Sequence, residues 1–225
     1  MEKPISPNNI NQDKWTDLRA RTTSSFAIAG ITLAALWIGG VIFACLIIFA
    51  AITMMKEWEF LTKEDTKFMQ LFGYAYVILP CASILWLRSD ANAGFKLNIA
   101  LIALISATDI AAYFVGKKFG RTKLAPTISP GKTFEGLAGG VVAAILTGLL
   151  MSAYTNVFNS FFIVAIASGS VAILAQAGDL FKSWIKRKAG VKDSGTILPG
   201  HGGLIDRLDG YMFTAPLLAL IYYLR

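Results

Sequence analysis

Long apolar runs separated by short basic loops are the feature that most constrains the fold of this chain. The runs are 26–55, 68–87, 97–116, 137–155, 160–178 and 210–224. A helix needs about 20 predominantly apolar residues to cross a bilayer. Only 16% of the residues are charged, against about 25% in soluble domains. We therefore predict an all-α, polytopic integral membrane protein, whose formal charge of +7 reflects membrane topology rather than binding of nucleic acid.

The first run is longer than one ordinary crossing and holds Gly39 and Gly40 at its centre. Basic residues mark cytoplasmic loops, and loops 117–132 and 182–207 contain the most. Two runs separate these loops, so both should face the same side. The tail 1–25 joins them there only if the first run turns back at its glycines. Of the 21 Lys and Arg residues, Arg88, Lys96 and Arg225 alone then lie outside.

This count predicts about seven membrane helices, including an N-terminal hairpin whose two arms are too short to cross comfortably. Segment 1–25 is polar and lacks the apolar core of a secretory signal, so we interpret it as a cytosolic tail. Neither a linker nor an internal repeat divides the rest of the sequence. Residues 26–225 are therefore predicted to form a single transmembrane domain that carries the chemistry.

Polar residues at membrane depth by default mark function, and they concentrate in three places. Asp109 lies deep in run 97–116, and a glycine-containing basic loop follows at 116–136. The third place, 178–209, is the most informative. Asp179 and Ser183 share a helical face at i, i+4, and Asp206 and Asp209 point the same way if a helix starts near them.

Between these carboxylates lies a glycine run, 199–203, that lets the backbone approach an anion closely. Hard Mg²⁺ is held by one or two carboxylates together with substrate phosphates, and Lys and Arg neutralise the remaining charge. Carboxylates, bases and a glycine loop in one stretch therefore predict a site for a nucleoside triphosphate.

The third stretch closely resembles the signature of phosphatidate cytidylyltransferases, also called CDP-diacylglycerol synthases. The matching pieces are Ser183, Lys186-Arg187, Lys192-Asp193, His201-Gly202-Gly203 and Asp206-Arg207-Leu208-Asp209. Asp109 and segment 129–136 look like a second region of that family, so the resemblance covers about 106–216. It implies that CTP and phosphatidate react to CDP-diacylglycerol and pyrophosphate, at a multi-pass protein of the inner (plasma) membrane with its active site facing the cytoplasm. It also implies a homodimer.

The resemblance and the spacing together assign roles to individual residues. We expect Asp179 and Asp206 to hold Mg²⁺, while Asp209 is either a ligand of a second cation or a helix N-terminal charge. The expected catalytic residues are Asp179, Asp206, Lys186, Arg187 and Arg207. The expected substrate-binding residues are Asp109, Ser129, Lys132, Thr133, Ser183, Lys192, Asp193, His201, Gly202 and Gly203.

Plainer interpretations stay open for several of these residues. Asp179 and Asp206 could be interfacial carboxylates paired with Lys or Arg, and 186–188 could be a basic anchor at the membrane surface. Thr133 could cap the helix that follows it. A structural or substrate-contact role is favoured for His201 over that of a general base, because phosphatidate is already an anion.

Two other functions compete with phosphatidate cytidylyl transfer. A related enzyme could use CTP with a different lipid phosphate, of isoprenoid or archaeal type. The apolar residues that would contact the lipid tail form no recognisable motif. A transporter could line a polar path with Asp109 and Asp179, but it would not need so many carboxylates, glycines and bases in one loop.

Overall fold

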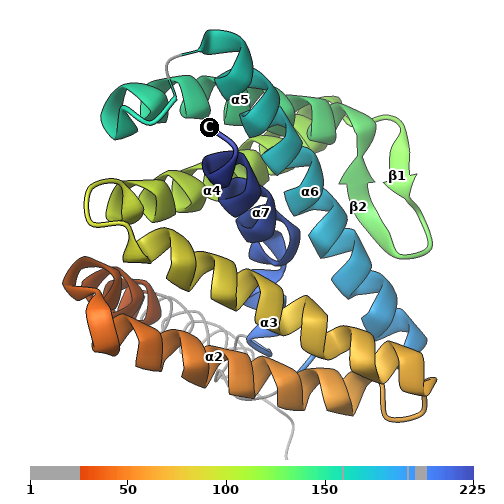
Figure 1. Ribbon diagram of the computed structural model, residues 1–225. Helices are drawn as coiled ribbons and strands as arrows, with labels where there is room; N and C mark the ends of the chain where they lie inside the picture. Colours follow the sequence, from red (N-terminus) through yellow and green to blue (C-terminus); the bar gives the residue numbers. More distant parts are fainter. Residues whose placement is uncertain (1–25, 159, 192, 196–201) are drawn as a thin grey trace, which may run out of the picture.

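The computed structural model describes residues 26–158, 160–191, 193–195 and 202–225, which form seven helices and one β-hairpin. A short helix, Phe26–Ile38, comes first. The elements that follow are α2 (Gly40–Leu61), α3 (Lys67–Ser89), α4 (Gly94–Phe119), β1 (Lys123–Ala125), β2 (Ser129–Thr133), α5 (Phe134–Thr155), α6 (Phe161–Lys188) and α7 (Ile205–Tyr223). Helices α2 to α6 are each long and apolar enough to cross a membrane. The predicted all-α, polytopic membrane architecture is confirmed (Figure 1).

The predicted break in the first apolar run is confirmed at Gly39, whose φ of 70° lies in the left-handed region, as does the φ of 54° at Gly40. Arg88 closes the turn, because its guanidinium donates to the carbonyl oxygens of Leu36 (2.8 Å) and Trp37 (3.2 Å). The expectation of two short arms is wrong for the second arm. Helix α2 continues past the predicted end of the run and has 22 residues, because Trp58 and Leu61 are buried in the core.

The basic loops gather at one end of the helices, as the charge pattern predicts. Lys188 at the end of α6 pairs with Asp65 in the α2–α3 loop at 2.6 Å. Lys132 of β2 pairs with Asp179 of α6 at 2.5 Å. The α2–α3 loop, the β-hairpin and the end of α6 therefore lie at the same end of the molecule.

The opposite end collects the basic residues that the sequence places outside. Arg88 lies at the end of α3, and the Tyr222 hydroxyl donates to Asp90 at 2.5 Å, with Arg225 donating to the Tyr222 oxygen at 2.8 Å. Lys96 lies over the Tyr154 ring. Among the residues that the structure describes, these basic side chains thus lie at the two ends that the sequence predicts.

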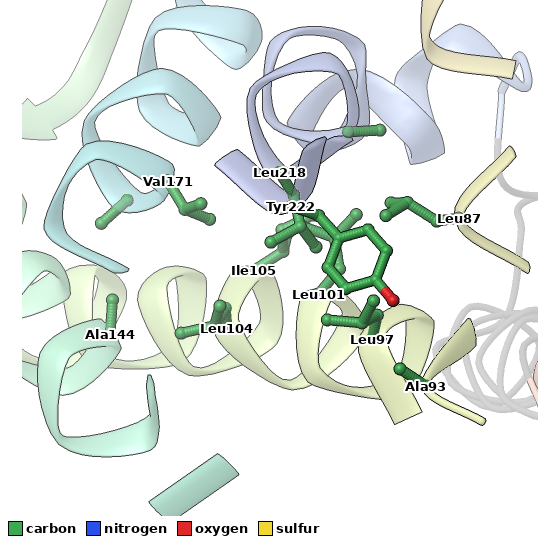
Figure 2. Packing of buried hydrophobic residues seen from close by; sticks show 12 residues of the cluster. Leu87, Ala93, Leu97, Leu101, Leu104, Ile105, Ala144, Val171, Leu218 and Tyr222 are labelled. Carbon is green, nitrogen blue, oxygen red and sulfur yellow. The ribbon is translucent and has the colours of Figure 1, made fainter. Parts of the chain in front are cut away.

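The core lies where α4 packs against α5, α6 and α7. Figure 2 shows Leu97, Leu101, Leu104 and Ile105 of α4 directed towards Val171 and Leu218. Helices in membranes approach closely through small residues, and a Cβ on Gly148 of α5 would lie 1.8 Å from Ser168 Oγ of α6.

One local feature was not predicted. Loop 117–132 contains an antiparallel β-hairpin, β1 with β2, which a short polar segment with Pro126 and Pro130 does not signal. Helix α6 continues beyond the apolar run, which ends at Gly178, as far as Lys188. Asp179 and Ser183 therefore lie on one regular helix, as their spacing predicts. The helix is longer than its apolar run because its last turns pack against other parts of the protein, where Ile185 is buried.

Candidate active site

A cavity of about 800 Å³ opens beside the β-hairpin, between the ends of α4 and α6 and the start of α7. Its wall carries four carboxylates and four basic side chains. These are Asp109, Asp179, Asp206, Asp209, Lys117, Lys123, Lys132 and Arg207. Small-molecule sites usually have volumes of roughly 300–1,000 Å³, so the cavity can hold a nucleotide.

Lys182 joins two of these carboxylates. Its ammonium lies 2.8 Å from Asp179 Oδ1, one turn earlier on α6, and 2.6 Å from Asp209 Oδ2 on α7. The two helices can approach this closely because a glycine lies at the crossing. A Cβ on Gly178 would lie 2.4 Å from the carbonyl oxygen of Asp209. The carboxylates of Asp179 and Asp209 therefore share the Lys182 ammonium, and all three side chains are largely shielded from water.

Lys132 connects the β-hairpin to the same group. Its ammonium lies 2.5 Å from Asp179 Oδ2 and donates to Gln176 Oε1 at 2.6 Å. The Gln176 amide in turn donates to Asp109 Oδ1 at 3.0 Å. A chain of polar contacts thus runs from Lys132 through Gln176 to Asp109, the one carboxylate of α4. Gln176 was missed by sequence reasoning, although a glutamine inside an apolar run is the signal that could have found it.

Asp206 has a separate set of partners. Oδ1 accepts from Lys186 at 2.5 Å, and Oδ2 accepts from the backbone N–H groups of Ser194 (2.9 Å) and Gly203 (3.3 Å). Gly202, whose φ of 77° lies in the left-handed region, turns the chain so that this approach is possible. The structure therefore brings Asp179 together with Asp209, whereas Asp206 lines another part of the same cavity.

The remaining predicted site residues divide into four groups. Asp109, Ser129, Lys132, Thr133 and Arg207 line the cavity together with the aspartates. Ser183, Arg187 and Asp193 are absent from its lining, and Arg187 and Asp193 are exposed. Lys186, Gly202 and Gly203 surround Asp206. Lys192 and His201 lie outside the described residues, as does segment 1–25.

Some plainer interpretations are also seen in the structure. Thr133 is the N-cap of α5, and its Oγ1 accepts from Gly136 N at 3.1 Å, so it both caps a helix and lines the cavity. Lys188 is absent from the cavity lining and pairs with Asp65. Hydrogen bonding to Lys188 holds the pKa of the Asp65 carboxyl below its ordinary value.

Glu57 of α2 was missed by sequence reasoning. Only 3% of it is exposed, and its carboxylate accepts from the backbone N–H groups of Leu204 (2.7 Å) and Ile205 (2.9 Å) at the start of α7. Glu57 follows Lys56 just after the end of an apolar run, so in the sequence it resembles an ordinary interfacial charge and is only a weak signal. Only the fold reveals that it is buried against α7.

The donor atoms of the cavity suit a hard divalent cation. Mg²⁺ takes oxygen ligands and is often held by one or two carboxylates with substrate phosphates, and the carboxylates of Asp179 and Asp209 already converge on one positive charge. In the described part of the chain, no group of three His, Cys, Asp or Glu side chains is arranged to enclose a metal. A cation here would therefore depend on phosphate oxygens for much of its coordination.

Comparison with known proteins gives a consistent result. The model of the cytidylyltransferase family matches residues 65–225. A phosphatidate cytidylyltransferase of Brucella suis is 34% identical, with 91% of this chain and 93% of that protein covered. Proteins of the same name from Rickettsia bellii and Staphylococcus epidermidis are each 36% identical, covering 86% and 75% of this chain and 85% and 65% of their own lengths.

Proposed function

This chain belongs to the cytidylyltransferase family, and from that membership we propose that it transfers a cytidylyl group from CTP to phosphatidate. The products are CDP-diacylglycerol and pyrophosphate. The observation that carries the proposal is that Asp179 and Asp209, both on the wall of a nucleotide-sized cavity, converge on Lys182. This cavity lies at the end of the helices where the basic loops lie.

In the proposed reaction a phosphatidate oxygen attacks the α-phosphorus of CTP. One P–O bond forms, and the bond to the leaving pyrophosphate breaks in line with it. The attacking oxygen is already anionic, so the step needs positioning and neutralisation of charge more than a base. Lys132 and Lys182 now neutralise carboxylates. Phosphate oxygens of CTP would replace the carboxylate as the partner of Lys132, which lines the cavity with Arg207. Lys182 would keep its two carboxylates.

We further propose that Mg²⁺ binds among Asp179, Asp206 and Asp209, with CTP phosphates completing its coordination. When bound, the cation would neutralise charge on the triphosphate and the leaving pyrophosphate. The protein's own part is to keep the carboxylates close enough together to share a cation. Lys182 does so by holding Asp179 of α6 against Asp209 of α7. Mg²⁺ removal by a chelator should abolish turnover.

The protein is a multi-pass membrane protein. We propose that it lies in the inner (plasma) membrane with the cavity facing the cytoplasm, because CTP arrives from that side and basic loops favour it. The acyl chains of phosphatidate would stay in the lipid beside the apolar helices. We also propose a homodimer, which rests on the family resemblance and which cross-linking in the membrane would test.

The decisive experiment is product analysis with purified protein, labelled CTP and a panel of lipid phosphates. Phosphatidate should yield a CDP-lipid and pyrophosphate, with CTP preferred over ATP and GTP. An isoprenoid or archaeal-type lipid phosphate should be a poor acceptor. Equal consumption of ATP, or faster reaction with another lipid phosphate, would overturn the proposed substrate pair.

A further inference from the structure

The part of the chain that precedes the family match contributes a buried carboxylate to the framework of the site. Glu57 lies near the end of α2, and the match begins at residue 65. The first N–H groups of a helix have no partner within it, and Leu204 at the N-cap of α7 makes no side-chain cap hydrogen bond. Glu57 supplies the missing acceptors, one oxygen to Leu204 N and the other to Ile205 N.

Glu57 also reaches Asp206 through Ser194. The buried Ser194 hydroxyl lies 3.1 Å from Glu57 Oε2 and 3.0 Å from Asp206 Oδ2. The space around these atoms is full, since a Cβ on Gly203 would lie 2.0 Å from Ser194 Oγ and 2.5 Å from Glu57 Oε2. With the N–H groups of Ser194 and Gly203 also on Asp206 Oδ2, Asp206 is held in one place.

We propose that Glu57 is a positioning residue for the cation-binding carboxylates of the proposed reaction, on which this inference rests. Glu57 is not part of the cavity lining and acts through Ser194 and the first turn of α7. Asp206 lies in that turn and Asp209 in the next. An α7 start that could fray would displace both carboxylates relative to Asp179, and cation binding would weaken.

The test compares Glu57→Gln and Ser194→Ala with the matched control Glu59→Gln. Glu59 is exposed on the same helix, where it accepts from the Tyr74 hydroxyl. Two quantities are measured on detergent-solubilised protein: the rise in melting temperature with Mg²⁺ and CTP, and the Mg²⁺ concentration for half-maximal activity. Glu57→Gln turns an amide NH₂ towards a backbone donor, so we expect that concentration to rise about tenfold and the thermal response to shrink.

Ser194→Ala should change both quantities in the same direction by less, because the Ser194 N–H bond to Asp206 is kept. Glu59→Gln should match the wild type. A residue that merely stabilised the fold would lower the amount of folded enzyme and leave the Mg²⁺ requirement of the remainder unchanged. That result for folded Glu57→Gln overturns the positioning role, and if this variant does not fold, an unchanged Mg²⁺ requirement in Ser194→Ala overturns it.

Measurements on the wild type distinguish a failure of this inference from a failure of the proposed function. A wild-type protein that neither responds thermally to CTP with Mg²⁺ nor forms a CDP-lipid would overturn the proposed function itself. A responsive wild type with unaffected Glu57 and Ser194 variants would leave the function in place and remove only the positioning role.

Discussion

The ammonium nitrogen of Lys132 lies 2.5 Å from Oδ2 of Asp179, and this ion pair joins the β-hairpin after α4 to the last turns of α6. The same nitrogen donates to Gln176, one turn earlier on α6. The two basic loops of the sequence therefore form one wall of one cavity, with Asp179 between Lys132 and Lys182.

Replacing Asp179 with Asn should reduce CDP-lipid formation on the order of 10³-fold, because a neutral amide is a poor Mg²⁺ ligand and several kcal/mol of transition-state stabilisation are lost. Asp206→Asn and Asp209→Asn should fall in the same range. Double variants should be scarcely worse, since the carboxylates act as a unit. Asp65→Asn, at a carboxylate that pairs with Lys188 and does not line the cavity, is the control. Near wild-type turnover with unaltered Mg²⁺ dependence in Asp179→Asn would remove the metal site from this cavity.

Lys132→Gln should raise the KM for CTP about tenfold, because a charge-assisted hydrogen bond to a phosphate contributes roughly 1.5–3 kcal/mol. The matched control is Lys188→Gln, whose ammonium pairs with Asp65 away from the cavity lining. Steady-state kinetics at saturating Mg²⁺ measure both. Equal effects of the two substitutions would mean that Lys132 serves the fold and not the nucleotide.

Single cysteines at Lys123 and Lys188 should resist a membrane-impermeant thiol reagent in sealed cells, and a cysteine at Lys96 should react. The first two positions lie at the cavity end of the helices and the third at the opposite end. The parent protein would have Cys45 and Cys81 replaced by Ala. Labelling of Lys123→Cys from outside would invert the topology and place the cavity on the wrong side for CTP.

Gly178→Ala should lower the free energy of unfolding by about 1–3 kcal/mol, as overpacking typically does, because its Cβ would lie 2.4 Å from the Asp209 carbonyl oxygen. Gly30→Ala is the matched control. Gly30 lies in the helix Phe26–Ile38 with nothing within 4 Å of its Cβ position, so alanine there should be neutral or slightly stabilising. Both variants are compared with the wild type by their melting temperatures in detergent. Equal shifts for Gly178→Ala and Gly30→Ala would refute the close crossing of α6 and α7.

Tyr222→Phe should destabilise the protein, and this destabilisation should become smaller as the pH falls. The hydrogen bond from Tyr222, with those from the backbone of Ala93 and Asn92, holds the pKa of the Asp90 carboxyl below its ordinary value. Because the pKa of this carboxyl is lower in the folded than in the unfolded protein, it contributes fully to stability at pH values above its unfolded pKa of about 3.9. This contribution is lost as the pH falls through the pKa of the folded state.

The difference in melting temperature between wild type and Tyr222→Phe should therefore be constant from about pH 8 to about pH 5 and shrink below about pH 4. Tyr223→Phe, at an exposed neighbour, is the control and should show no such pH dependence. A difference that grew on acidification would contradict the assigned hydrogen bond.

The sequence by itself determined which segments enter the membrane and where the charges collect. Transfer of a residue into lipid is a local property of its side chain, so runs of apolar residues predict helices and basic residues predict their ends. The break at Gly39 and the partition of Lys and Arg could be read in this way. So could the residues that resemble the family signature, because they are close together in the chain.

The tertiary structure alone decided which of these residues meet. Asp179 shares Lys182 with Asp209, and not with Asp206, because α6 and α7 cross at Gly178, and a crossing depends on the shapes of two helices rather than on either sequence segment. For the same reason Glu57 looks like a surface charge in the sequence and is a buried acceptor at the start of α7 in the fold.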